Sequence, residues 1–263
     1  MEDKTRKKRY LHQANAIAAW GHITRPFCEP IPTQAALALP VTGGYGSTRV
    51  DGFRYKEILS FGAAYTEVIG SEHGPDGPFD TLALTAVEKL NILDVVTCDR
   101  LVARISSRRD IASDEPEITT LGSRFERLRI GNHFFEELDL GAGMLCDCVT
   151  WKKLQAALQD GAKRETLAKA AMAAPNGERV ATPDGKQMPN SIGFSLAPGC
   201  GRAASIKDVP WRIPVEQVGT VYLGEFFVSE YSRQLVMLRV QLGCPLAGDG
   251  GAGGAGGGGV PFP

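Results

Sequence analysis

The sequence predicts an all-β fold, a mainly antiparallel sandwich or flattened barrel that carries a short two-helix insertion. Nearly every periodic segment alternates apolar and polar side chains with a period of two, the period of a strand. Clusters of glycine, proline and asparagine separate these segments and predict turns. The chain has no internal repeat of fixed length, which argues against a propeller or a solenoid.

Composition divides the 263 residues into three parts. Residues 1–9 form a basic start that we expect to be disordered and solvated. Residues 10–246 are expected to form a single β-rich domain, with a helical insertion at 150–174. Residues 247–263 form a glycine-rich tail. The hydrophobic fraction of 43% is close to that of globular proteins and suffices for a core.

The first half of the domain is expected to consist of strands, which alternation places at residues 9–20, 35–41, 79–90 and 95–106. Two more strands fit residues 47–72, where Gly52 and Gly62 predict bulges. The pattern of residues 95–106 predicts a slip in register near Asp99. A hairpin follows, in which residues 118–130 and 134–140 are joined by a tight turn at Gly131 and Asn132.

The pattern changes from strand to helix after Cys148. Thr150 is a plausible N-cap, and an apolar stripe predicts a helix that ends at Gly161. The stripe consists of Trp151, Leu154 and Leu158. Residues 163–174 are rich in alanine and predict a second helix, so the pair would form an αα-hairpin.

Strand patterns return in the last part of the domain, at residues 192–196, 211–218, 220–229 and 234–242. The last two strands are joined by a short polar segment and predict a hairpin. Its expected buried residues are Leu223, Phe227, Val236 and Leu238.

The tail is almost entirely glycine and alanine from residue 247 to residue 259. Such a segment has little to bury and much backbone entropy to lose, so we expect it to be disordered. It ends in an apolar tetrapeptide, Val260, Pro261, Phe262 and Pro263. On a flexible tether this tetrapeptide is a candidate partner-binding element that docks in a groove of a partner or of a neighbouring copy. A tail without a role is the alternative.

Charge and hydropathy exclude several classes of protein. The net charge of -1 provides no field to attract nucleic acid or an anionic membrane. No apolar stretch reaches the length of about 18 residues of a spanning helix, so we expect a soluble, cytoplasmic protein without membrane insertion. Six cysteines without a C-x-x-C motif indicate reduced thiols, of which Cys98 is expected to be buried.

Candidate sites for chemistry are weak, so we assign no catalytic residue, no metal ligand and no cofactor. No G-x-S-x-G motif presents a nucleophile. Cys146 and Cys148 are closer together than zinc ligands usually are, so their redox or metal role stays open. An oxygen-rich turn contains Glu72, His73, Asp76 and Asp80. It could hold a cation, but the glycines and prolines of the segment already explain it as a loop. Paired carboxylates have no predicted cleft, and the aromatic residues could line a sugar-binding face or fill the core.

Two segments, residues 91–104 (NILDVVTCDRLVAR) and 120–132 (TLGSRFERLRIGN), resemble a pattern in uncharacterised bacterial β-rich proteins with choice-of-anchor type domains. The resemblance covers less than a third of the chain. It implies a β-sandwich and no catalytic residue.

Three function classes remain open on this evidence. A structural or partner-binding sandwich, possibly self-assembling, is the first. A small-ligand or carbohydrate-binding protein is the second, and a hydrolase-type enzyme is the third. A long exposed strand edge or an apolar patch would favour the first, an aromatic groove the second, and a polar cleft with a perturbed histidine or carboxylate the third.

Overall fold

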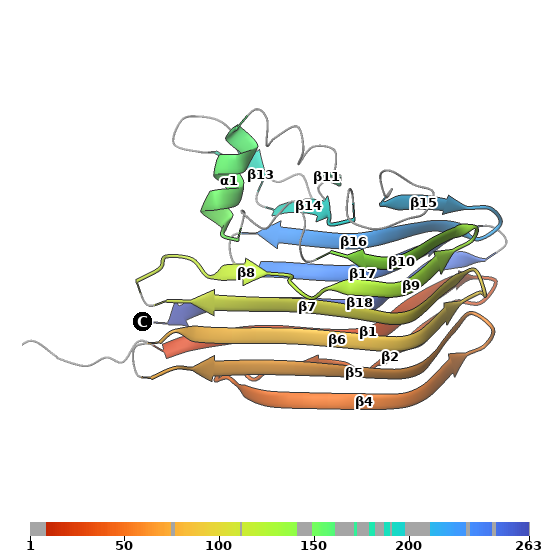
Figure 1. The fold of residues 1–263 in the computed structure, drawn as a ribbon, viewed down its shortest axis with the longest axis horizontal. Coiled ribbons are helices and arrows are strands. Elements are labelled where there is room, and N and C mark those ends of the chain that lie inside the picture. The colour runs from red at the N-terminus through yellow and green to blue at the C-terminus, as the bar shows by residue number, and fades with distance from the viewer. Residues whose placement is uncertain are drawn as a thin grey trace, which may run out of the picture.

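Two large antiparallel sheets pack face to face in a computed structural model of the chain (Figure 1). The structure describes residues 9–74, 77–110, 112–140, 149–160, 171–172, 179–181, 187–189, 191–197, 211–229, 232–243 and 246–262. Both large sheets are open at their edges, so of the two predicted arrangements the sandwich is confirmed.

Sheet A has the strand order β11-β14-β16-β17-β18-β1-β2, with β15 added to β16 and β3 added to β1. Its strands are β1 (Arg9–Arg25), β2 (Glu29–Gln34), β3 (Leu37–Ala38), β11 (Ala171–Met172), β14 (Ser191–Ser195), β15 (Arg212–Val215), β16 (Gly219–Ser229), β17 (Ser232–Leu242) and β18 (Ala247–Phe262). A separate pair joins β12 (Arg179–Ala181) to β13 (Gln187–Pro189).

Sheet B has the order β10-β9-β7-β6-β5-β4, with β8 added to β7. Its strands are β4 (Gly44–Tyr55), β5 (Leu59–Glu72), β6 (Phe79–Ile92), β7 (Val96–Arg109), β8 (Glu117–Thr119), β9 (Arg124–Ile130) and β10 (His133–Asp139). The four strands β4 to β7 form a meander. The hairpin of β9 and β10 closes at Gly131, which has a φ of 55°.

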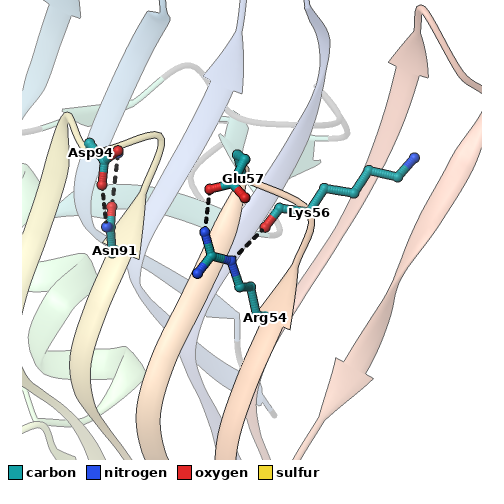
Figure 2. Close-up of polar contacts among 5 residues, drawn as sticks. All are labelled: Arg54, Lys56, Glu57, Asn91 and Asp94. Atoms are coloured by element: carbon teal, nitrogen blue, oxygen red, sulfur yellow. Dashed lines mark hydrogen bonds and ion pairs between the residues drawn. The ribbon is translucent and has the colours of Figure 1, made fainter.

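The hairpin turns at one end of sheet B are held by side chains (Figure 2). In the turn between β6 and β7, Leu93 and Asp94 both have positive φ, and Asn91 and Asp94 hydrogen-bond each other through backbone and side chain. In the turn between β4 and β5, Arg54 donates to the carbonyl of Lys56 and to the carboxylate of Glu57. A backbone hydrogen bond from Leu93 to Ile58 joins the two turns.

A crease crosses six strands of sheet B, namely β4, β5, β6, β7, β9 and β10, and Figure 1 shows these strands bending together near one end. At the crease, each of the six strands has one residue that lies opposite the corresponding residue of its neighbour, as the register pairs on both sides of it show. These residues are Gly52, Gly62, Lys89, Asp99, Arg127 and Glu136. On alternate strands the residue has positive φ, namely Gly52, Lys89 and Arg127. The register continues unchanged on both sides of the crease, so the bulges expected at Gly52 and Gly62 and the register slip expected near Asp99 are wrong; the crease changes the backbone conformation without an extra residue.

The crease changes which side chains face the core, because a left-handed residue breaks the two-residue alternation of a strand. Buried positions are three residues apart there instead of two. In β7 burial passes from Cys98 to Leu101, and in β9 it passes from Leu128 to Phe125. Sheet A has a matching crease at Ala18, Gly253, Met237 and Gly224.

This crease corrects one of the predicted core residues. Leu223, Val236 and Leu238 are buried as expected, but Phe227 is only half-buried and its neighbour Phe226 lies in the core. Gly224, with a φ of 59°, shifts the alternation of β16 by one residue. The prediction assumed an unbroken period of two and was therefore wrong at Phe227.

The helix α1 (Trp151–Gln159) lies at the end of the sandwich opposite the crease (Figure 1). Thr150 caps it as predicted, since its side chain accepts a hydrogen bond from the backbone N–H of Lys153. Trp151 and Leu154 are buried. Most of the second predicted helix lies outside the described residues, and its described part, Ala171–Met172, is strand β11. In the described part of the chain, no helix combines the length and the apolar character needed to cross a membrane.

The glycine-rich tail is the largest departure from the sequence-based expectation. Instead of being disordered, residues 247–262 form β18, which pairs with β17 on one side and with β1 on the other. The single domain therefore extends beyond residue 246. The partner-binding tetrapeptide is also affected, because Val260, Pro261 and Phe262 pair with β1, while Pro263 lies outside the described residues.

Glycine suits β18 because neighbouring side chains occupy the space above both of its faces. A Cβ atom at Gly251 would lie 2.5 Å from the ring of Trp20, and one at Gly256 would lie 2.3 Å from Oδ1 of Asn15. From the opposing sheet, Leu101 would come within 2.2 Å of a Cβ at Gly253. The strand thus contributes backbone hydrogen bonds, and its neighbours contribute the packing atoms.

Candidate functional site

A groove of about 500 Å³ runs over the outer face of sheet B, beside β8. The registers of β5 to β8 place Ile69, Leu82, Ser106 and Thr119 in one row across the sheet. These four residues line the groove, and Ile69 and Leu82 give it a partly exposed apolar floor. We call this feature the β6–β8 groove.

A second row crosses the same strands one step closer to their ends and carries alternating charge. Asp80 pairs in register with Arg108, which pairs with Glu117. All three residues line the groove. The Asp80 carboxylate lies 2.8 Å from Nε2 of His73, and the Glu117 carboxylate lies 3.3 Å from Nζ of Lys153 on α1. An apolar row beside a row that carries both negative and positive charges is complementary to a segment in which an apolar residue lies next to charged residues.

A polar cluster lies buried inside the sandwich at the same end of β6. The His12 ring is 1% exposed, and its Nδ1 lies 3.0 Å from Oγ1 of Thr81. Its Nε2 is buried without a hydrogen-bond partner. Burial lowers the pKa of His12, although the Glu72 carboxylate opposes that shift. Glycine is needed on two sides of the ring, since Cβ atoms at Gly43 and Gly70 would lie within 3.0 Å of it.

A second histidine faces a thiol at the surface. Sγ of Cys28, in the exposed turn between β1 and β2, lies 3.8 Å from Nε2 of the half-buried His22 on β1. Asp249 of β18 is opposite His22 in the register. The order of residue types matches a nucleophile, a base and an orienting carboxylate, but the structure records no contact between His22 and Asp249, and the base needs such an orienting partner. This arrangement is the closest approach to an enzyme site in the described residues.

A buried ion pair stabilises the outer side of β16. Glu225 is 1% exposed and accepts two hydrogen bonds from Arg239, at 2.7 and 2.6 Å. The Arg239 guanidinium also stacks 3.8 Å from the centre of the Tyr222 ring. Because both carboxylate oxygens of buried Glu225 accept a hydrogen bond, we assign the pair a structural role.

The other residues considered in the sequence are scattered or lie outside the description. The structure brings His73 and Asp80 together, as the oxygen-rich turn suggested, but Asp76, Cys146 and Cys148 are not described. Within the described ranges, no three histidine, cysteine or acidic side chains gather as metal ligands. The described tryptophans lie on β1, on α1 and just before β15, so they do not form one platform. Cys98 is a buried free thiol, as predicted.

The sequence patterns did not predict the β6–β8 groove. Its floor residues stand on β5, β6 and β7, and only the register brings them into one row. The alternation of β6 did indicate that Leu82 faces away from Thr81 and Ala83, and an apolar residue on the outer face was the available signal.

Comparisons with known proteins give a family and no function. No curated protein and no solved structure matched the chain. A family model described as Domain of unknown function (DUF8256) matches residues 10–229, which run from β1 to the end of β16. Because this match covers well over half of the chain, the protein belongs to the DUF8256 family.

Proposed function

We propose that this protein is a partner-binding sandwich that holds an extended peptide segment in the β6–β8 groove. One observation carries the proposal: the apolar row of Ile69 and Leu82 runs beside the charged row of Asp80, Arg108 and Glu117. Such a pair of rows is complementary to a segment with an apolar side chain flanked by a cation and an anion. The free thiols Cys28 and Cys98 support a reducing, cytoplasmic location.

The alternatives receive less support from the same residues. None of the residues that line the groove is aromatic, whereas sugars stack on aromatic rings. His12 is only 1% exposed, so its ring offers a substrate almost no surface. Cys28 lies on an exposed turn, and a nucleophile is usually activated inside a cleft that excludes water.

Selection from a displayed library of random peptides tests the proposal with a defined probe. We expect enriched peptides to share an apolar residue next to charges of both signs. Their binding should fall at least about tenfold, or 1.4 kcal/mol, in a Leu82→Glu variant, because a carboxylate replaces the apolar floor. Leu84→Glu is the matched control, since Leu84 lies on the same face of β6 but does not line the groove.

Two outcomes would contradict the proposal: no enriched sequence class, or equal loss of binding in the Leu82 and Leu84 variants. Native mass spectrometry of the purified protein distinguishes binding of a small ligand from binding of a peptide. A bound small molecule that is lost in Leu82→Glu would assign the groove to a small ligand instead of a peptide.

A further inference from the structure

The strand β18 occupies a slot between two strands that are not paired with each other. Without it, β17 and β1 would each present an unpaired edge in the middle of sheet A. Unpaired edges recruit extended segments by backbone hydrogen bonding. The space between β17 and β1 is therefore a strand-accepting site, and β18 is the occupant seen in the structure.

The slot recognises its occupant by the absence of side chains. Trp20 and Asn15 lie over one face at Gly251 and Gly256, and Leu101 lies over the other face at Gly253. A residue larger than glycine at these three positions would overlap those groups. Thr85 of β6 adds a polar contact, because its hydroxyl donates to the carbonyl of Gly254 across the sandwich at 2.9 Å. Among sequences in this chain, only the glycine-rich segment satisfies these requirements.

The same composition makes β18 easier to release than the other central strands. Its described buried side chains are only the methyl groups of Ala252 and Ala255, whereas β6 buries residues as large as Leu90 and Val87. Apolar burial therefore holds β18 weakly, and released glycines regain the most backbone entropy of any residue. A hollow of about 380 Å³ also borders the strand at Gly256 and Gly257.

We infer that the slot between β1 and β17 can accept β18 from a second copy of this chain, so that two copies exchange their C-terminal strands. In the exchanged form, the strand β17 that ends at Leu242 and the strand β18 that begins at Ala247 of one chain lie in different copies. The exchanged dimer keeps every backbone pair of the closed monomer, because the incoming strand has the same sequence. Concentration then decides between the two forms. This inference concerns a different site from the β6–β8 groove and does not depend on it.

A disulfide trap distinguishes the two forms in the full-length chain. Gln241 and Asp249 are exposed and directly opposite each other in the register of β17 and β18, which suits a disulfide. In a Gln241→Cys/Asp249→Cys variant, the disulfide joins two chains only if β18 has been exchanged. The trap requires that the natural cysteines other than buried Cys98 are replaced by serine.

We expect the disulfide-linked dimer to increase with the protein concentration during refolding. It should rise from a small share at about 10 µM to about half near 1 mM, the effective concentration typical of a short linker. A Thr220→Cys/Gln241→Cys variant is the matched control. It joins β16 to β17 within one chain in both forms, and it should stay monomeric at every concentration.

Light scattering of the natural chain, refolded at the same concentrations, protects the test against variants that fail to fold. A dimer that persists after dilution supports exchange. Only monomers at every concentration, or a Gln241→Cys/Asp249→Cys disulfide that always closes within one chain, would overturn the inference. Leu82→Glu should leave the exchanged dimer unchanged, so failure of the groove proposal is recognised separately.

Discussion

Replacement of Gly253 by alanine tests whether β18 is packed inside the sandwich. Gly253 has a φ of 69°, and a Cβ atom there would lie 2.2 Å from Cδ2 of Leu101 and 3.2 Å from Met237. The left-handed conformation costs an L-residue about 1–2 kcal/mol. Leu101 is fully buried, so the overlap adds an overpacking cost of about 1–3 kcal/mol. Gly253→Ala should therefore lower the free energy of unfolding by roughly 2–5 kcal/mol.

Gly52 provides a control that separates backbone strain from packing. Its φ of 70° is almost the same, but a Cβ atom at Gly52 would have no neighbour within 4 Å. Gly52→Ala should therefore cost only the backbone part, about 1–2 kcal/mol. Urea unfolding measures both variants, provided that the slope of the transition does not change.

A double-mutant cycle assigns the extra cost to the contact with Leu101. Leu101→Ala alone should cost about 2–5 kcal/mol because it leaves a cavity. Combined with Gly253→Ala, it should cost less than the sum of the two single variants, by about 0.5–3 kcal/mol. Equal costs for Gly253→Ala and Gly52→Ala, or additive costs in the cycle, would refute the packing of β18 against β7.

Three further predictions concern single side chains. In the native protein a thiol reagent should modify Cys28 rapidly and Cys98 slowly, as peptide mapping would show, because burial raises the pKa of Cys98 to about 12. Burial lowers the pKa of His12 below its usual value of 6.5, so the unfolded state binds a proton more readily than the folded state. The free energy of unfolding should therefore decrease as the pH falls below 6.5. Between pH 7 and pH 5, the slope of this free energy against pH should be smaller in His12→Asn than in the natural chain. Phe226→Ala should cost about 3–5 kcal/mol in chemical denaturation, and Phe227→Ala should cost clearly less; the reverse order would place the crease of β16 elsewhere.

The sequence by itself determined the fold class and most of the strands. In β6, every second residue from Phe79 to Val87 faces the core, and a period of two predicts a strand with one face in the core. Turn chemistry fixed the hairpin at Gly131, and the cap at Thr150 fixed the start of α1. These features depend on residues that are close together in the chain, so the sequence predicts them without a structure.

Only the tertiary structure determines that the glycine tail forms a strand. A segment without side chains carries no periodicity, so its sequence looks the same whether it is disordered or lies between two strands. The side chains that make β18 a strand belong to other elements, such as Trp20 on β1 and Leu101 on β7.

The crease and the β6–β8 groove were decided in the same way. Positive φ at Lys89 and Arg127 is imposed by alignment across the sheet, since neither residue type favours it. Ile69 and Leu82 become one apolar floor only because the register of β5 and β6 places them opposite each other. Pairing between distant segments determines register, and one chain's sequence carries no local signal for it.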